Sequence, residues 1–429
     1  MIGTLLVILF GGLALALPVA AVLVLATVVL DQTFSFFPVM PVVGEMLWSG
    51  SSNFSLTAVP LFILTGELLL SSGIAARMFR AIDAWVRVVP GGMLHTIIGS
   101  SALFSATSGS SVATAATIGT VAMPEMKTGR YAPPLFFGSI AAGGTLGILI
   151  PPSINMIIYG VLAEVSIGRL YLAGMIPGLL LALLFSTIVV VLTLWQRRGS
   201  RMQVTPATWR ERIEALPGVL PPVVLFMLMV GSIYVGVATP TEAAALGFLA
   251  ALGMTAMAGR LSWPMLLRAF ERTMRTTCMV MLIVLAAELL NFVMVSVGLA
   301  DQIRSLVAAT NASPLTIMLG IVVAYMVLGC FMETLSLMIA TTPIVVPIIT
   351  SIGYDPVWFG VVFMILIEAA LITPPIGMNL FVVQSVRNEG SFADVSRGAL
   401  PFVLAMLAMI GLLIAFPGLA NWLPSVLRG

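Results

Sequence analysis

The chain has 429 residues, of which 60% are hydrophobic and only 8% are charged. Soluble domains carry about a quarter charged residues, so this composition excludes a soluble enzyme and predicts an integral membrane protein. Nineteen basic residues face 17 acidic ones, and this near balance argues against a nucleic-acid-binding protein.

No Lys or Arg precedes Arg77 in the sequence. A cleaved signal peptide begins with a basic segment, so the apolar N-terminus is expected to be a retained membrane helix. Residues 3–31 form either one helix or two short helices broken at Pro18. Further segments of about 20 residues, the length that crosses the hydrocarbon layer, are predicted as transmembrane helices at 54–72, 170–195, 217–237, 240–259, 276–298 and 399–422.

The basic residues cluster between the apolar segments, and the excess of Lys and Arg in cytoplasmic loops assigns each cluster to a side. Sixteen of the 19 fall on one face, which we expect to be cytoplasmic, and Arg169, Arg304 and Arg428 fall on the other. The sixteen are Arg77, Arg80, Arg87, Lys127, Arg130, Arg197, Arg198, Arg201, Arg210, Arg212, Arg260, Arg268, Arg272, Arg275, Arg387 and Arg397. The same distribution predicts a periplasmic C-terminus.

Residues 91–126 and 314–350 do not fit single spans. Each segment is long enough to cross and return, yet its two ends must lie on the same side. Both are therefore predicted as re-entrant helical hairpins. Backbone that breaks inside a membrane is tolerated only where protein or a water-filled cavity satisfies it, so two hairpins predict a buried functional site.

The two halves of the chain match at a constant spacing along the sequence. Pro151-Pro152 matches Pro374-Pro375 and Pro124 matches Pro347, while slightly different spacings pair Glu67-Leu68-Leu69 with Glu288-Leu289-Leu290 and Pro18 with Pro240. Each half runs helix, short polar arm, hairpin, broken helix, helix, and the charges place the two hairpins on opposite sides. Inverted repeats with interrupted helices point to a secondary transporter with a site near the midplane.

The turn of the first hairpin is rich in hydroxyl groups. Seven Ser and Thr residues occupy the thirteen positions from Ser105 to Thr117. Any one of them could serve only close helix packing. Together with carbonyls from unwound helix ends, however, such hard oxygen ligands suit a small cation. At the repeat spacing Glu333 and Glu368 replace Ser110 and Thr145, so the two halves are chemically unequal.

Carboxylates within apolar segments are costly and need a reason. Glu67 and Glu288 lie outside the hairpins and breaks, where structural hydrogen bonding is favoured, and Glu242 begins an apolar segment. For Glu333 and Glu368, a role near ion or substrate, including proton transfer, and a role in bracing a hairpin both stay open. No basic residue falls in the tips or breaks, so an anion would be held by helix N-termini, hydroxyls and bound cations.

The missing motifs exclude other activities. A P-loop needs Gly before its Lys, but the only lysine, Lys127, follows Met126, so the chain is not expected to use ATP. The single His95 rules out an HExxH metalloprotease site and is interpreted as a packing or capping residue, and Cys278 and Cys330 as packing residues. We expect no enzymatic activity and no cofactor.

Four motifs in order resemble the large membrane subunit of the tripartite ATP-independent periplasmic (TRAP) transporters over essentially the whole chain. They are SATSGSSVATAATIG with MPEM, GGTLGILIPPS, ATPTEAAALG and EAALITPPIGMNLFV. The resemblance implies sodium-coupled import of an organic anion, such as a C4-dicarboxylate, keto acid or sialic acid. It also implies that the chain lies in the bacterial inner membrane and has two partners, a small four-helix membrane subunit and a periplasmic substrate-binding protein.

The implied fold is an all-α polytopic membrane protein whose transport domain moves like an elevator against a scaffold. Its predicted parts are scaffold helices and the arm of repeat 1 at 1–90; the transport part of repeat 1 at 91–168, with hairpin 91–126 and broken helix 132–163; connecting and scaffold helices with the arm of repeat 2 at 169–313; the transport part of repeat 2 at 314–398, with hairpin 314–350 and broken helix 357–386; and a C-terminal helix at 399–429.

The resemblance also suggests ligands. It places a first sodium ion at Ser105, Ser108, Gly109, Ser110, Gly143, Gly144 and Gly147, and a second at Met332, Glu333, Thr334, Thr373, Pro374 and Gly377. Substrate is expected between the tips, near Ser111, Thr114, Ser153, Asn155, Ser336 and Asn379. Two alternatives remain: a self-sufficient divalent-anion/sodium symporter without a binding protein, and a membrane scaffold that does not transport.

Overall fold

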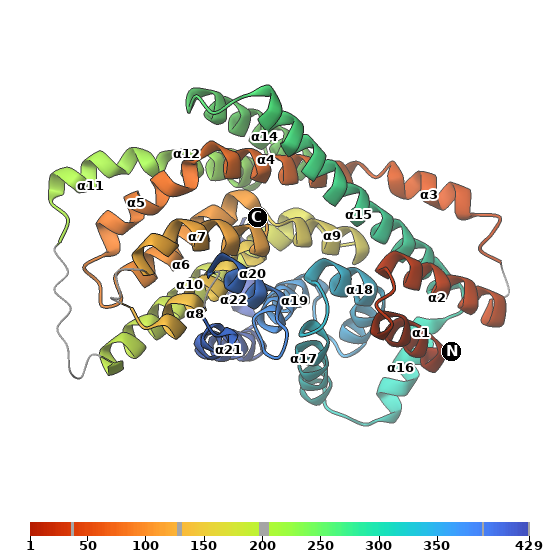
Figure 1. Ribbon diagram of the computed structural model, residues 1–429. Helices are drawn as coiled ribbons and strands as arrows, with labels where there is room; N and C mark the ends of the chain where they lie inside the picture. The colour runs from red at the N-terminus through yellow and green to blue at the C-terminus, as the bar shows by residue number, and fades with distance from the viewer. Residues whose placement is uncertain (36–37, 127–130, 197–205, 388–389, 428–429) are drawn as a thin grey trace.

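The computed structural model describes residues 1–35, 38–126, 131–196, 206–387 and 390–427, and within these ranges it contains helices and no strand (Figure 1). The predicted all-α fold is confirmed. The cytoplasmic assignments of Lys127, Arg130, Arg197, Arg198 and Arg201, and the opposite assignment of Arg428, lie outside the described residues.

The first half of the chain ends with a long helix that follows a broken one. Its helices are α1 (Ile2–Ala14), α2 (Val19–Phe34), α3 (Val43–Ser51), η1 (Phe54–Thr57), α4 (Ala58–Ser72), α5 (Ile74–Val86), α6 (Met93–Ser108), α7 (Ser111–Met126), α8 (Pro133–Leu149), α9 (Ile154–Leu162) and α10 (Ile167–Gln196). The N-terminus thus forms two short helices, and α2 begins directly after Pro18.

The second half repeats this order after a connecting segment. The connection contains α11 (Trp209–Ala215), η2 (Leu216–Gly218), α12 (Leu220–Phe226), the π-helical segment η3 (Met227–Gly231) and α13 (Ser232–Tyr234). Then follow α14 (Pro240–Met257), α15 (Trp263–Ser296), α16 (Leu299–Ala309), α17 (Pro314–Gly329), α18 (Thr334–Ser351), α19 (Pro356–Leu371), α20 (Met378–Arg387), α21 (Phe392–Ala415) and α22 (Gly418–Val426).

Several helices are long and apolar enough to cross a membrane. Among the described residues there are five, or seven if each of two bent pairs counts as one span. One bent pair is α8 with α9, whose axes differ by 44°. The chain is therefore a multi-pass membrane protein.

The two halves pack against each other in a reciprocal way. Helix α14 packs on α4, and α2, its counterpart in the first half, packs on α15. Likewise α8 packs against α21, and α19 packs against α10. Figure 1 shows α14 above α4 at the top of the view and α15 running downward to the right, with α9 below α4 and α18 below α15. Each half thus completes the packing of the other.

Several helix boundaries differ from the sequence expectation, and the predicted helix at 217–237 is divided into η2, α12, η3 and α13. Helix α15 begins at Trp263, well before the predicted start at 276, because the charged segment ahead of the apolar one continues the same helix. The predicted C-terminal helix at 399–429 is two helices. Helix α21 begins earlier, where the Ser391 hydroxyl accepts a hydrogen bond from Ala393 N at 3.1 Å, and it ends before Pro417, which has no N–H to continue the helix.

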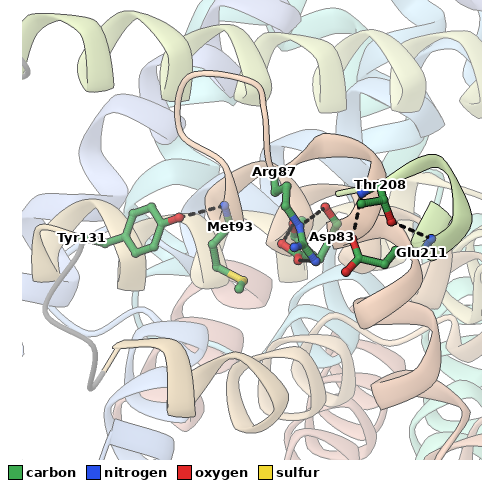
Figure 2. Close-up of polar contacts among 7 residues, drawn as sticks. Asp83, Arg87, Met93, Tyr131, Thr208 and Glu211 are labelled. Carbon is green, nitrogen blue, oxygen red and sulfur yellow. Dashed lines mark hydrogen bonds and ion pairs between the residues drawn. The ribbon is translucent and has the colours of Figure 1, made fainter. Parts of the chain in front are cut away.

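Polar contacts attach the first hairpin to the arm α5 (Figure 2). The backbone N–H of Met93 donates to the Tyr131 hydroxyl at 3.1 Å, which ties the start of α6 to the segment before α8. The Asp83 carboxylate on α5 pairs with Arg87 at 2.8 Å and accepts a hydrogen bond from the Thr96 hydroxyl on α6 at 3.2 Å. The base of the hairpin is thus fixed, and its tip lies at the other end of α6.

Candidate functional site

The first hairpin turns at Gly109, between the end of α6 and the start of α7. Gly109 has a φ of +62°, which a residue with a side chain rarely adopts. A Cβ atom here would also lie 3.0 Å from the carbonyl oxygen of Pro152. The glycine therefore permits a tight turn and brings the tip directly against the break between α8 and α9.

Most hydroxyl groups of the tip bond within the tip itself. The Thr114 hydroxyl donates to the Ser110 carbonyl at 2.7 Å and lies 3.2 Å from the Ser108 hydroxyl. The Thr117 hydroxyl donates to the Ala113 carbonyl at 2.7 Å. Ser105, by contrast, is fully buried and its hydroxyl has no hydrogen-bond partner among the described residues. Thr114 and Thr117 thus brace the turn, while Ser105 keeps a free oxygen beside it.

The break in the first repeat is shorter than the glycine-rich sequence suggests. Helix α8 continues through Gly143, Gly144 and Gly147 to Leu149, and only residues 150–153 are non-helical. The glycines instead allow close packing: a Cβ at Gly147 would lie 2.9 Å from the backbone of Ser110, and one at Gly144 would lie 2.8 Å from Ala115 Cβ. Because Pro151 has no N–H, the Gly147 carbonyl has no helical donor and remains available to a ligand.

The second tip lies between α17 and α18, and a carboxylate caps it. The Glu333 side chain accepts a hydrogen bond from Ser336 N at 3.0 Å, which starts α18. Gly377, at a φ of +53°, donates its N–H to the Cys330 carbonyl at 3.4 Å and so links this tip to the break after α19. The bonds Pro151-Pro152 and Pro374-Pro375 are both cis. Each repeat thus brings a hairpin tip against its own Pro-Pro break.

Glu368 is the most deeply buried carboxylate of the described chain. Its residue is 1% exposed, and neither carboxylate oxygen has a hydrogen bond of normal geometry. The Ser111 and Glu333 side chains are its polar neighbours, one from each tip. Among the described residues, the Asn379 amide and the Asn155 Nδ2 atom also have no hydrogen-bond partner. An unpaired buried polar group costs about 1–3 kcal/mol, so each of these groups suits a ligand that is present only part of the time.

A cavity of about 160 Å³ lies where the two tips meet. One water molecule needs about 10–15 Å³ on the same measure, so the space is large enough for an ion together with a small organic molecule. The sequence-predicted residues that line it are Ser108, Gly109, Ser110, Ser111, Asn155, Glu333 and Thr334. Residues of both repeats therefore share one cavity.

The other predicted residues do not line this cavity. Thr114 braces the first tip, and Ser153 caps α9, since its hydroxyl accepts from Met156 N at 3.4 Å. Ser336 receives the Glu333 cap, and the Thr373 hydroxyl donates to the Ala369 carbonyl at 2.6 Å. The remaining ones that do not line it are Ser105, Gly143, Gly144, Gly147, Met332, Pro374, Gly377 and Asn379.

Sequence reasoning missed the cavity wall that α4 and α15 provide. Gly66, Glu67 and Leu70 on α4 line the cavity together with Thr276 and Val280 on α15. A Cβ at Gly66 would lie 3.2 Å from the Ser108 carbonyl oxygen, so α4 touches the first tip.

A basic residue also comes close to this wall. Glu67 pairs with Arg272 at 3.3 Å, which joins α4 to α15. The sequence showed one sign of this pair, the Glu67 carboxylate within an apolar segment. Structural hydrogen bonding was favoured for that carboxylate, and a partner was not predicted. The pair brings the Arg272 guanidinium next to a cavity that has no basic residue in its described lining.

Comparisons with known proteins give the family. The family model described as "Tripartite ATP-independent periplasmic transporter, DctM component" matches residues 6–419. The chain belongs to this family. The resemblance seen in the four sequence motifs is thereby confirmed, and the chain is the large membrane component of a TRAP transporter.

Curated relatives and solved structures agree with this family. The chain is 33% identical to the sialic acid TRAP transporter large permease protein SiaM of Vibrio cholerae over 90% of both chains. It is 32% identical to the C4-dicarboxylate TRAP transporter large permease protein DctM of Pseudomonas aeruginosa over 88% of both chains. The YdaH transporter of Alcanivorax borkumensis has a similar fold, with a TM-score of 0.66 at 14% identity over 94% of this chain and 98% of that one.

Proposed function

We propose that the chain imports an organic anion together with sodium ions by an elevator-type movement. The anion is a carboxylate such as a C4-dicarboxylate, keto acid or sialic acid, and the two curated relatives are named for sialic acid and for C4-dicarboxylates. The chain acts in the bacterial inner membrane with a small four-helix membrane subunit and a periplasmic substrate-binding protein, since its family is tripartite.

The observation that carries this proposal is the shared cavity. It joins the tips of two related hairpins and is lined by hydroxyls, two carboxylates and an amide. Beside it lie the unpaired Ser105 hydroxyl and the freed Gly147 carbonyl. Hydroxyl and carbonyl oxygens are the donors that a small hard cation prefers, and unwound helix ends at the midplane typically supply them in transporters.

Sodium binding would prepare the cavity for an anion. The described lining contains no basic residue, so a carboxylate entering it needs positive charge from another source. Bound sodium ions and the N-termini of α7 and α18, which begin at the two tips, supply that charge. The anion is then held only when sodium is present, which couples the two fluxes.

In this proposal the moving part consists of the two hairpins and the two broken helices. Helices α4 and α15 stay in place, held together by the Glu67–Arg272 pair and by packing along their lengths. The glycine contact between Gly66 and Ser108 is a backbone contact without interlocking side chains, which suits a surface along which the tip slides.

The alternative is a self-sufficient sodium-coupled anion symporter without a binding protein. Membership of a tripartite family favours the first proposal over this one. A scaffold without transport activity would leave the unpaired polar groups around Glu368 without a purpose.

Two changes at the first tip test the sodium site. Replacing Ser108 and Gly109 together by bulky residues is expected to abolish sodium-dependent uptake into proteoliposomes that contain the chain and its small subunit. Undiminished uptake would remove the first site from consideration. Omitting the binding protein tests the partner claim: uptake that continues without it would favour the self-sufficient symporter.

A further inference from the structure

A second cavity lies on the same boundary as the site, further along α15. It has a volume of about 390 Å³ and lies between the end of α9 and the helices α3 and α15. Its polar lining consists of Ser49, Asn53, Glu164, Glu288 and Asn291, and no basic residue is among its described lining. The site cavity and this second cavity are therefore two hollows between the same two groups of helices.

The internal repeat relates the walls of the two cavities. The spacing that pairs Glu67 with Glu288 also pairs Leu70 with Asn291. Glu67 and Leu70 line the site cavity, whereas Glu288 and Asn291 line the second one. The equivalence extends to the packing around them, since α14 lies on α4 as α2 lies on α15.

The two cavities lie toward opposite ends of α15. Helices α4 and α15 are antiparallel, because Arg272 near the start of α15 meets Glu67 in α4, while Glu288 near the end of α15 meets Gly50 ahead of α4. The charge distribution predicts that the Arg272 end is cytoplasmic and the Glu288 end periplasmic. In the present structure, the hairpin tips lie at the level of Gly66 on α4 and Thr276 on α15.

We propose that Glu288 and Asn291 line the substrate cavity when it opens to the opposite side, as Glu67 and Leu70 line it here. This inference rests on the proposed elevator movement and assigns its second end point. Exchanging the conformations of the two repeats carries the second tip along α15 from the level of Val280 to that of Asn291. These residues are 11 positions apart, which is roughly 16 Å at about 1.5 Å per helical residue.

The chemistry of the second cavity suits this role. Where the site cavity has Leu70, the second has Asn291, and Asn53 and Glu164 add further polar groups. A polar, hydrated space lets a sodium ion and a carboxylate approach without losing all their water at once. The carboxylates Glu288 and Glu164 attract the sodium ion first, and the anion enters behind it.

Cysteine cross-linking tests this assignment. In a background with C278S and C330S, the pair V280C with L335C joins residues that line one cavity in the present state. The pair N291C with L335C tests the opposite state. The pair L282C with L335C is the control, because Leu282 lies on the same helix but is 62% exposed on its outer side. Each pair is treated with a short bifunctional thiol reagent in proteoliposomes with the small subunit.

We expect cross-links in the first two pairs and none in the control. Cross-linking of N291C with L335C should stop uptake, and cleaving the link should restore it. If N291C fails to react while L335C links to a different position beyond Val280 on α15, the elevator movement stands and this assignment is wrong. If only V280C reacts, and uptake continues with that link in place, the elevator movement itself fails and the assignment fails with it.

Discussion

Gly147 provides a sharp test of how the first tip is held. In a G147A variant, the added methyl group would lie 2.9–3.0 Å from three backbone atoms of Ser110 and Ser111. Ordinary carbon contacts need about 3.5–4.0 Å, so the tip must move by about half an ångström or more. Backbone atoms cannot rotate away as a flexible side chain would. The cost of such overpacking is about 1–3 kcal/mol.

This strain acts on the proposed sodium site, because Ser110 and the Gly147 carbonyl both belong to it. If sodium binding must overcome the whole strain, the sodium concentration for half-maximal effect rises by about 5- to 150-fold, at tenfold per 1.4 kcal/mol. The assay is sodium-dependent thermal stabilisation of the purified chain, followed by the sodium dependence of uptake.

The matched control is G320A. Gly320 lies in α17, a helix of the second hairpin, and nothing lies within 4 Å of the position that its Cβ would take. The control should keep the sodium response of the unmodified chain, and the better helix propensity of Ala should slightly raise its stability. A G147A variant with an unchanged sodium response would refute the reasoning about the tip.

Buried and paired groups give three further tests. S105A removes a hydroxyl that has no partner in the described chain. It should weaken the stabilisation of the chain by sodium without lowering the melting temperature in the absence of sodium. The control is S139A, which loses a 2.8 Å hydrogen bond to a backbone carbonyl and should leave the sodium response unchanged. R272Q should reduce uptake about fivefold or more, because it removes the cation beside the cavity. The control is R275Q, which breaks an exposed ion pair on the same helix worth about 0–1 kcal/mol and should leave uptake unchanged. Equal effects of the two variants would contradict the role of the Glu67–Arg272 pair. E368Q should unfold in detergent at the same or a higher temperature, because it removes a buried carboxylate without a hydrogen bond, and a clear fall in melting temperature would contradict this.

The sequence was sufficient to predict the helical fold and the pairing of its halves. Apolar segments of spanning length, basic clusters and the two Pro-Pro pairs were enough, because each reflects a local physical requirement. The ends of α15 and α21 could not be predicted from hydropathy. The charged residues at the start of α15 form helix as readily as the apolar residues that follow, so hydropathy does not mark where the helix begins. The start and end of α21 depend on single residues, the cap at Ser391 and Pro417.

The site was partly predictable for a similar reason. Hydroxyls at the Ser108–Ser111 turn are conspicuous in the sequence, and the structure brings them to the cavity. The α4 wall was not predicted, since Gly66 looks like any other helix glycine until its contact with Ser108 is seen. The resemblance suggested the glycines of α8 as sodium ligands, but in the structure they lie within a helix and allow close packing.

The measurement that tests the central claim most directly is accumulation of a labelled organic anion in proteoliposomes. The chain and its small subunit are reconstituted, the loaded binding protein is added outside, and a sodium gradient is the only energy source. Our account predicts accumulation above the external concentration, collapsing when a sodium ionophore dissipates the gradient. Accumulation that persists after the sodium gradient has been dissipated would contradict sodium coupling.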